Sequence, residues 1–372
     1  NQTKLLIKLA DFVAECEQPY GLKIVYGGTV KMKHVKKLRK KLYALKQSEN
    51  AVFVHGIGKR KTPLQKSIET LEDYLCRLKK YNQQIHICGG RNSYSKTDHD
   101  ATFMRMKEDA MGNGQLKPAY NLQHGVGSEY IAWLTIGPQP TDTTTLVPFL
   151  KDAEEHLKFK YKNISADAGY ESEENYVFLE ANGQLSYIKP ANYEISKTRK
   201  YRNDIGKIEN MEYDAGSDIY ICRNAKRLNA DHIRHSKSKT GYVSKKTIYK
   251  CEDCSGCPYK GGCIKGNNCK IPLEERTKTL QVARTFLKYR QEALERILSN
   301  EGIAFRINRS IQAEGSFGDL KQDMQFRRYV SKGTPNVLAE SILLAMARNI
   351  NKLHNKIQKG RTGTHLFPVK SA

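Results

Sequence analysis

Long apolar segments are missing from this sequence. No stretch approaches the roughly 18 consecutive apolar residues that a membrane-spanning helix needs, and neither end carries a compact amphipathic anchor. No internal repeat is visible either. The sequence therefore argues against a membrane protein, and at 372 residues it is long enough for two or three domains with buried cores.

An initiator methionine and a secretory signal are also absent. The chain begins NQTKLLIKLADF, without the apolar core and small-residue cleavage site of a signal peptide. We therefore expect a fragment of a cytoplasmic protein. The cysteines fit that compartment, because nine is an awkward number for a disulfide framework and five of them crowd into residues 251–269.

Acidic residues are in the minority. The chain has 39 Asp and Glu against 63 Lys and Arg, a formal net charge of +24, and basic residues occur in every segment. A polyanion is the expected partner, and nucleic acid is favoured because nothing in the sequence suits a membrane. A ribosomal protein or a merely soluble basic protein is the alternative interpretation of this charge.

Two amphipathic helices are expected in residues 1–90. In residues 30–46, apolar side chains recur at three- and four-residue steps. Thr62 and Pro63 then suit the N-cap and first position of a second helix, whose Leu and Ile residues keep a heptad spacing. The pair predicts a structural helical hairpin, while seven Lys and Arg between 31 and 41 could also contact a DNA backbone.

Residues 91–190 are interpreted as the first part of an α/β domain. The runs AYNLQHGV and EYIAWLTI predict two antiparallel strands joined by a two-residue loop at Gly127-Ser128. Helix, strand, helix and strand follow, with the third strand ending at Asp167 and the second helix ending at Gly183. The expected fold is α/β, a mixed sheet with flanking helices.

The remaining sequence divides into three parts. Residues 191–277 lack a clear period and are interpreted as an irregular insertion rich in Lys, Tyr, Gly and Cys. Residues 278–355 show three helical segments that would pack on the sheet, beginning with LQVARTFLKYRQEALERILS. Residues 356–372 predict a basic, loose tail.

Asp167 and Glu314 are the candidate catalytic acids. Asp167 follows an apolar strand, and open α/β sheets place their sites at that strand end; a simple cap for the next helix is an equally weighted alternative. Glu314 and Lys321 share a helical face about 10 Å apart, too far for the usual ion pair. That spacing suits a carboxylate on a metal and an ammonium on a DNA phosphate.

Phosphodiester chemistry explains why such groups would converge. A two-metal site needs carboxylates that hold two cations roughly 4 Å apart. Mg²⁺ prefers oxygen ligands and keeps several waters, so few protein groups suffice.

Three strings carry a family resemblance. ISADAGYESEENY, NRSIQAEGSFGDLKQDMQFRRYVSKGT and RNSYSKTDHDATFMRMK together resemble bacterial insertion-sequence transposases of the DDE type, over residues 91–355. The resemblance implies an RNase H-like catalytic domain, interrupted by a Cys-rich insertion before the last acidic helix. Asp167 aligns with the second catalytic Asp, Glu314 with the Glu, and Lys321 with the Lys that contacts the transposon end.

The resemblance also implies an activity and partners. It implies cleavage at transposon ends and strand transfer into target DNA, with Mg²⁺ or Mn²⁺ as the cofactor. The implied partners are DNA and a second copy of the chain on paired ends, and the implied location is the bacterial cytoplasm, in association with the nucleoid. A non-catalytic DNA-binding remnant and a metal-dependent nuclease without strand transfer are the alternatives.

The chain departs from the family in two places. The family's first catalytic Asp commonly lies in an Asp-Gly-Thr string, which this sequence lacks, so we expect it to precede Asn1 and the chain to be N-terminally truncated. The Tyr and Arg that precede the family's Glu are out of register here. Arg309 is one residue off, and we predict it to be a phosphate contact. Other acids look like the family's further acidic positions: Asp98, Asp100 and Asp142.

The cysteine cluster predicts a structural zinc site. Four thiolates about 2.3 Å from the ion would organise a segment with little core of its own. Reduced, structurally idle thiols are the alternative interpretation. Cys269 is an alternative ligand, and Cys222 or the pair His232 and His235 could replace one. The predicted ligands are Cys251, Cys254, Cys257 and Cys263.

Overall fold

The computed structural model describes residues 1–106, 111–266 and 269–363. By the contacts between its residues the chain divides into two units, residues 1–99 and 100–372. Within these described ranges, no helix combines the length and the apolar character needed to cross a membrane.

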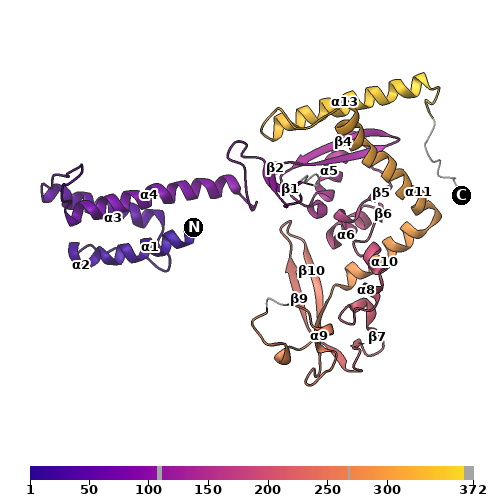
Figure 1. Ribbon diagram of the computed structural model, residues 1–372, viewed down its shortest axis with the longest axis horizontal. Helices are drawn as coiled ribbons and strands as arrows, with labels where there is room; N and C mark the ends of the chain where they lie inside the picture. The colour runs from indigo at the N-terminus through magenta and orange to yellow at the C-terminus, as the bar shows by residue number, and fades with distance from the viewer. Residues whose placement is uncertain (107–110, 267–268, 364–372) are drawn as a thin grey trace. The chain divides into compact units, whose positions relative to one another are not determined.

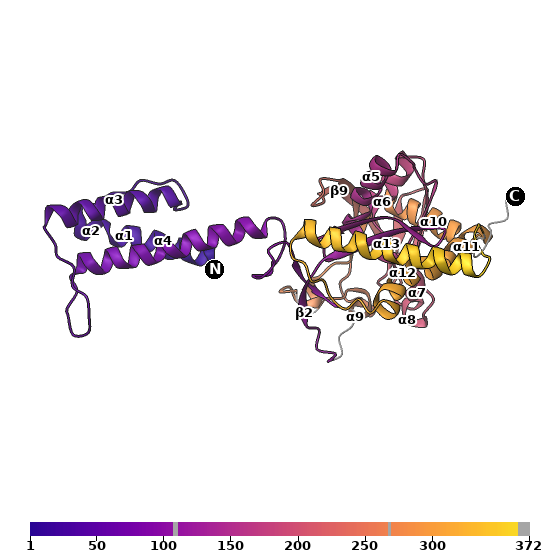
Figure 2. The same ribbon diagram turned by 90° about the horizontal axis from the view of Figure 1, so that it is seen from above.

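The first unit is helical. It consists of α1 (Gln2–Glu15), α2 (Glu17–Tyr20), α3 (Met32–Ser48) and α4 (Pro63–Cys88). The predicted hairpin of α3 and α4 is confirmed, and so is its cap, because Thr62 Oγ1 accepts the N–H of Gln65 at 3.2 Å. Helix α1 packs along both (Figure 2) and adds a third apolar stripe to the core.

The second unit begins with two strands that the sequence did not predict, β1 (Thr102–Arg105) and β2 (Leu116–Ala119). The elements that follow have the predicted order. The predicted hairpin turns at Ser128 and Glu129, one residue later than expected, and both have positive φ, 51° and 74°, as a two-residue hairpin loop of type I′ requires. The series is β3 (Asn121–Gly127), β4 (Tyr130–Gly137), α5 (Leu146–Leu157), β5 (Asn163–Ala166), α6 (Glu173–Ala181) and β6 (Leu185–Ile188).

These strands form pairs and not one sheet. β3 and β4 pair antiparallel, β5 and β6 pair parallel, and no hydrogen-bonded strand of the described chain joins the two pairs. The mixed α/β character is confirmed, whereas the single mixed sheet is not observed. Local sequence patterns identify strands, but they do not identify which distant strand is the neighbour.

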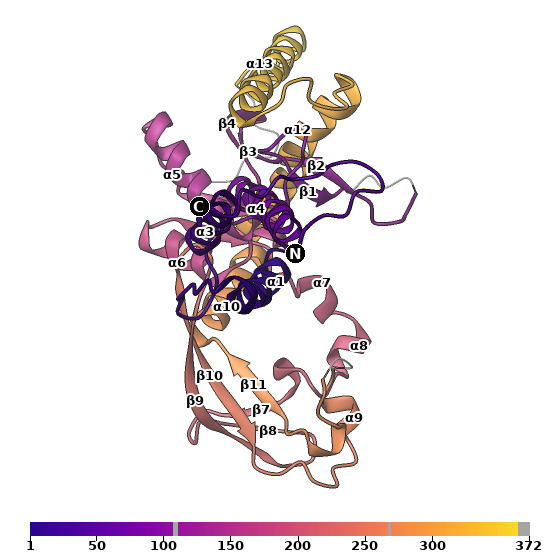
Figure 3. The same cartoon turned by 90° about the vertical axis from the view of Figure 1, so that its left-hand side faces the viewer.

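The segment predicted to be irregular, residues 191–277, holds four strands of a five-stranded sheet, so that prediction was wrong. Five strands pair antiparallel in the order β11-β10-β9-β8-β7 (Figure 3). β9 is exposed along nearly its whole length, so it has no apolar alternation from which to recognise a strand. The strands are β7 (Glu212–Asp214), β8 (Ile219–Ile221), β9 (Arg227–Lys237), β10 (Val243–Cys251) and β11 (Thr279–Val282).

Three short helices accompany this sheet, and longer helices close the unit. The short ones are α7 (Tyr193–Ser196), α8 (Arg199–Arg202) and α9 (Lys260–Cys263). The helix expected from residue 280 instead begins after β11. The closing helices are α10 (Arg284–Leu298), α11 (Asn300–Arg309), α12 (Gly315–Gly318) and α13 (Thr334–Gln358).

Helix α13 covers the β3–β4 hairpin (Figure 1). Asn349 accepts the N–H of Ile131 at 2.9 Å and donates to its C=O at 2.9 Å, and Lys352 pairs with Glu129 at 3.1 Å. The helix extends past Asn355 to Gln358, so the first residues of the predicted tail are helical. Residues 364–372 of that tail lie outside the described residues.

Candidate active site

Asp167 lies directly after β5 and before a single 3₁₀ turn, Ala168–Tyr170. Its Oδ1 accepts the N–H of Gly169 at 2.8 Å. The strand-end position and the cap, which the sequence offered as alternatives, are therefore both present. The cap uses one carboxylate oxygen and fixes the orientation of the other.

A second carboxylate, that of Asp142, lies beside Asp167. A Cβ placed on Gly169 would lie 3.0 Å from Asp167 Oδ1 and 3.1 Å from Asp142 Oδ2. Both acids therefore crowd a position that only a residue without a side chain leaves open. The two acids are 25 residues apart, and the sequence assigned Asp142 no role in the site.

Polar side chains from β3 hold Asp142 in place. Its Oδ1 accepts hydrogen bonds from Asn121 Nδ2 at 2.7 Å and from Gln123 Nε2 at 3.1 Å. The other end of the Gln123 amide accepts the hydroxyl of Tyr170. One signal was available in the sequence, because Asn121 and Gln123 alternate in AYNLQHG and so share one strand face.

The pKa of Tyr170 depends on burial, on both acids and on Arg309. Burial raises the pKa of the Tyr170 hydroxyl, the carboxylates of Asp142 and Asp167 raise it further, and Arg309 lowers it. The phenol therefore stays protonated and serves as a donor.

Glu314 is held by the helix on which it sits. Arg309 Nη2 lies 3.1 Å from Glu314 Oε1, and Ser310 Oγ donates to Oε2 at 3.3 Å. Residues 310–314 form a π-turn between α11 and α12, in which hydrogen bonds join residues five apart, the same separation as Arg309 and Glu314. Glu314 nevertheless remains 64% exposed.

A cavity lies between the end of β5 and the C-terminal half of α11, and neither Asp167 nor Glu314 lines it. It has a volume of about 270 Å³, and its lining includes Ala166, Arg309 and Ser310. Ala166 immediately precedes Asp167, and the other two residues hold Glu314. The cavity therefore shows that the end of β5 lies near the C-terminal half of α11.

Lys321 lies on the surface in a second π-turn, residues 319–323. The sequence analysis placed Lys321 and Glu314 on one helical face by assuming 3.6 residues per turn throughout. Two π-turns alter that register, so the spacing alone no longer places the ammonium beside the acid.

The acidic residues fit a divalent cation in donor chemistry. Carboxylate oxygens are the ligands that Mg²⁺ and Mn²⁺ prefer. Across residues 1–106, 111–266 and 269–363, however, no three Asp, Glu, His or Cys side chains are close enough to hold one ion together. Glu314 would have to leave Arg309 and turn toward Asp142 and Asp167.

Several thiols cluster where the five-stranded sheet ends. Burial, and then the Cys254 thiol, raise the pKa of Cys251 to about 12. Burial also raises the pKa of Cys263, which Lys278 lowers, and three further thiols raise it: Cys222, Cys254 and Cys257. The backbone N–H of Lys278 donates to Cys254 Sγ at 3.4 Å.

The alternative zinc ligands differ in position. Cys222 begins the turn between β8 and β9 and acts electrostatically on both Cys251 and Cys263. Cys269 is exposed. His232 and His235 lie farther along β9, opposite Ile248 and Lys245. Of these substitutes, only Cys222 affects the pKa of Cys251 and Cys263.

A comparison with protein families matches part of the chain. Residues 221–354 match the family model described as Transposase DDE domain. The matched segment contains Glu314, Arg309 and Lys321 as well as the thiol cluster, and Asp167 precedes it. Neither a curated protein nor a solved structure matches the chain. Residues 221–354 therefore carry a transposase DDE domain, which implies a transposase function.

Proposed function

We propose that this protein is a DNA transposase that cleaves the phosphodiester at a transposon end and joins the freed 3′-hydroxyl to target DNA. The observation that supports this most is the DDE domain match across Glu314. A cavity lined by Ala166, at the end of β5, and by Arg309 and Ser310, which both contact Glu314, lies nearby. Asp167 and Glu314 are the proposed ligands of Mg²⁺ or Mn²⁺, and Asp142 is a third acid beside them.

The chain's own residues have separate roles in this proposal. Bound divalent cations would activate the attacking oxygen and stabilise the leaving oxygen. Asn121, Gln123 and Tyr170 fix the orientation of the acidic pair. Arg309 forms an ion pair with Glu314. An incoming DNA phosphate would compete for the Arg309 guanidinium, and the Glu314 carboxylate would then be released toward Asp142 and Asp167. Lys321 is the second proposed phosphate contact.

An RNase H-like sheet is part of the proposal. The pairs β3–β4 and β5–β6 each keep an edge to which no other described strand is hydrogen-bonded. A further strand paired with both edges would join them in one mixed sheet. The family resemblance puts the first catalytic Asp on such a strand.

A zinc ion in the thiol cluster is proposed as a structural element. Cys254, Cys257 and Cys263, with Cys251 or Cys222, would supply four thiolates. These thiols would have to close around the ion, because no three of them among the described residues are close enough to hold it in this structure. Elemental analysis of purified protein should give about one zinc per chain, and Cys257→Ser with Cys263→Ser should lose it. Zinc-free protein that keeps the same unfolding midpoint would contradict a structural role.

Glu314→Gln tests the catalytic assignment. The substitution keeps size and hydrogen bonding but removes the charge that a cation needs, so Mg²⁺-dependent cleavage of a labelled duplex with a transposon end should disappear. Binding of that duplex should be unchanged. Glu295→Gln, on α10, is the matched control and should cleave normally. Cleavage retained by Glu314→Gln would refute the assignment.

A non-catalytic DNA-binding protein is the second candidate. It is favoured by the Arg309–Glu314 ion pair, which occupies the carboxylate that catalysis needs. In that case the wild-type chain would bind duplex DNA and cleave nothing in Mg²⁺ or Mn²⁺. An in-frame Asp-Gly-Thr strand encoded upstream of Asn1 would favour the transposase instead, and a joined-product assay separates it from a simple nuclease.

A further inference from the structure

The outer face of α3 is cationic. Val35, Leu38 and Leu42 are buried in the core of the first unit. Lysines spaced at i, i+3, i+4 and i+7 occupy the opposite side, because this spacing keeps them on one helical face. All four are exposed, and α3 contains no acidic residue. They are Lys33, Lys36, Lys37 and Lys40, called here the α3 lysine face.

No acid in the described part of the chain forms an ion pair with any of these four lysines. The neighbouring Arg39 is different, because Glu72 of α4 holds it. Desolvation lowers the pKa of His34, and the charges of Lys33, Lys31 and Lys37 lower it further. The α3 lysine face is thus a concentration of positive charge that lacks an internal counterion.

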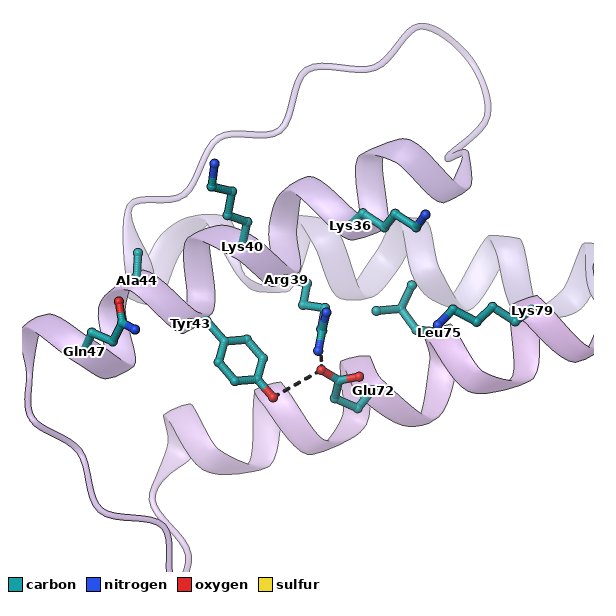
Figure 4. Close-up of a pocket in the computed structure, with 9 residues that line it drawn as sticks. All are labelled: Lys36, Arg39, Lys40, Tyr43, Ala44, Gln47, Glu72, Leu75 and Lys79. Carbon is teal, nitrogen blue, oxygen red and sulfur yellow. Dashed lines mark hydrogen bonds and ion pairs between the residues drawn. The ribbon is translucent and has the colours of Figure 1, made fainter.

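A polar groove continues this charge from α3 onto α4. It has a volume of about 820 Å³, and its lining includes Lys36, Lys40 and, from α4, Lys79. Figure 4 shows Arg39 and Tyr43 pointing at Glu72, which Tyr43 contacts at 3.2 Å. Because Glu72 already interacts with Arg39 and Tyr43, the lysines of the groove are available to bind an anion.

We propose that the sugar-phosphate backbone of a DNA duplex binds along the α3 lysine face. The inference rests on the proposed function only in taking DNA as the polyanion. The four lysines span about 10 Å of helix axis, and each strand of DNA presents a charge about every 3.4 Å. Several phosphates can therefore be contacted at once.

The chemistry of this face favours DNA backbone over other polyanions. Lysine acts as a point charge on phosphate and reads no base sequence, so the contact positions DNA without selecting it. A membrane-surface helix instead needs large apolar side chains beside its cations. The apolar stripe of α3 is already buried against α1 and α4, and Ala44 and Gln47 continue the exposed side.

The test compares two variants with the same change in charge. One replaces the four residues of the α3 lysine face with Gln, which has a similar helix propensity. The matched control replaces four exposed lysines on α1 and α4 with Gln. Binding of the full chain to a mixed-sequence duplex is measured by fluorescence anisotropy over a range of NaCl. The control lysines are Lys4, Lys8, Lys66 and Lys80.

The α3 variant should lose at least about tenfold in affinity near 100 mM salt, and its salt slope should be shallower by about three to four. The control should change by less than about threefold. Circular dichroism checks that both variants remain helical. Equal losses in both variants, or no loss in the α3 variant, would overturn the proposal.

Anionic vesicles of phosphatidylserine and phosphatidylcholine are the second probe. If the α3 variant loses vesicle binding but keeps duplex binding, the face serves a membrane and the proposal is wrong. The duplex-binding measurement does not depend on catalysis, because Glu314→Gln should bind the duplex normally. A chain that binds DNA through α3 and never cleaves it would refute the proposed function alone.

Discussion

At the scale of single residues, the site depends on a glycine. Gly169 lies between Asp142 and Asp167, and a side chain there would meet an oxygen of each acid at 3.0 and 3.1 Å. Its φ is not in the left-handed region, so the backbone would accept alanine. The requirement for glycine at this position therefore comes from the two carboxylates.

Gly169→Ala should move both acids by a few tenths of an ångström. The fold should be affected by no more than about 1 kcal/mol, because only the flexible ends of two side chains must shift. Mg²⁺-dependent cleavage should fall by about tenfold or more, since small misplacement of reacting groups is costly. Initial rates on a labelled duplex measure this loss.

Gly318→Ala is the control for that substitution. A Cβ at Gly318 meets nothing within 4 Å, and the residue lies in helical backbone. It should cleave as wild type does. If Gly169→Ala also cleaves at the wild-type rate, then Asp142 and Asp167 do not act together.

At the scale of elements, periodic sequence predicted structure well. The helices α3, α4 and α13 were recognisable because each buries one face and exposes the other. The hairpin strands β3 and β4 were recognisable from their β-branched and aromatic residues. β9 exposes both faces, so its sequence carried no strand signal. Asp167 was predictable because an apolar strand runs directly into it, whereas its neighbour Asp142 depends on tertiary folding.

The π-turns were not predictable either. They lie within one continuous helical stretch, and their sequence, SIQAE and DLKQD, fits an ordinary α-helix. This stretch packs on β3. His124 stacks on Phe317 with ring centroids 4.3 Å apart, and its Nδ1 lies 3.1 Å from Ser316 Oγ.

This contact between β3 and the helix should make stability depend on pH. Burial, and then the charge of Arg348, lower the pKa of His124 to about 4, from 6.5. Between pH 6.5 and about 4, His124 binds a proton in the unfolded chain but not in the folded chain. Stability is therefore full above pH 6.5 and falls as the pH drops toward 4, by about 3 kcal/mol.

Urea unfolding at several pH values measures this effect. Fluorescence of the single tryptophan, Trp133 on the adjacent strand β4, reports on the correct unit. His124→Gln removes the titrating ring, so its unfolding free energy should vary less between pH 7 and pH 4 than that of wild type. Equal variation in both proteins would show that His124 does not carry the dependence.

At the scale of the whole molecule, the excess of 63 basic over 39 acidic residues opposes folding. Like charges repel in the compact state, and salt screens them over a Debye length of about 10 Å at 0.1 M. Without DNA, the melting temperature should therefore rise when NaCl is increased from about 20 to about 300 mM. A fall over that range would show that the charges are already compensated internally.

Duplex DNA should reverse this trend, because it binds the folded state and neutralises the same charges. At low salt it should raise the melting temperature by several degrees, since a ligand at 100 times its Kd adds about 2.7 kcal/mol. The gain should shrink as NaCl rises, because counterion release no longer favours binding. Substituting the α3 lysine face should reduce the increase in melting temperature caused by DNA. It should leave most of the increase caused by NaCl alone. A gain from DNA that is insensitive to NaCl would instead indicate contacts that do not depend on phosphate charge.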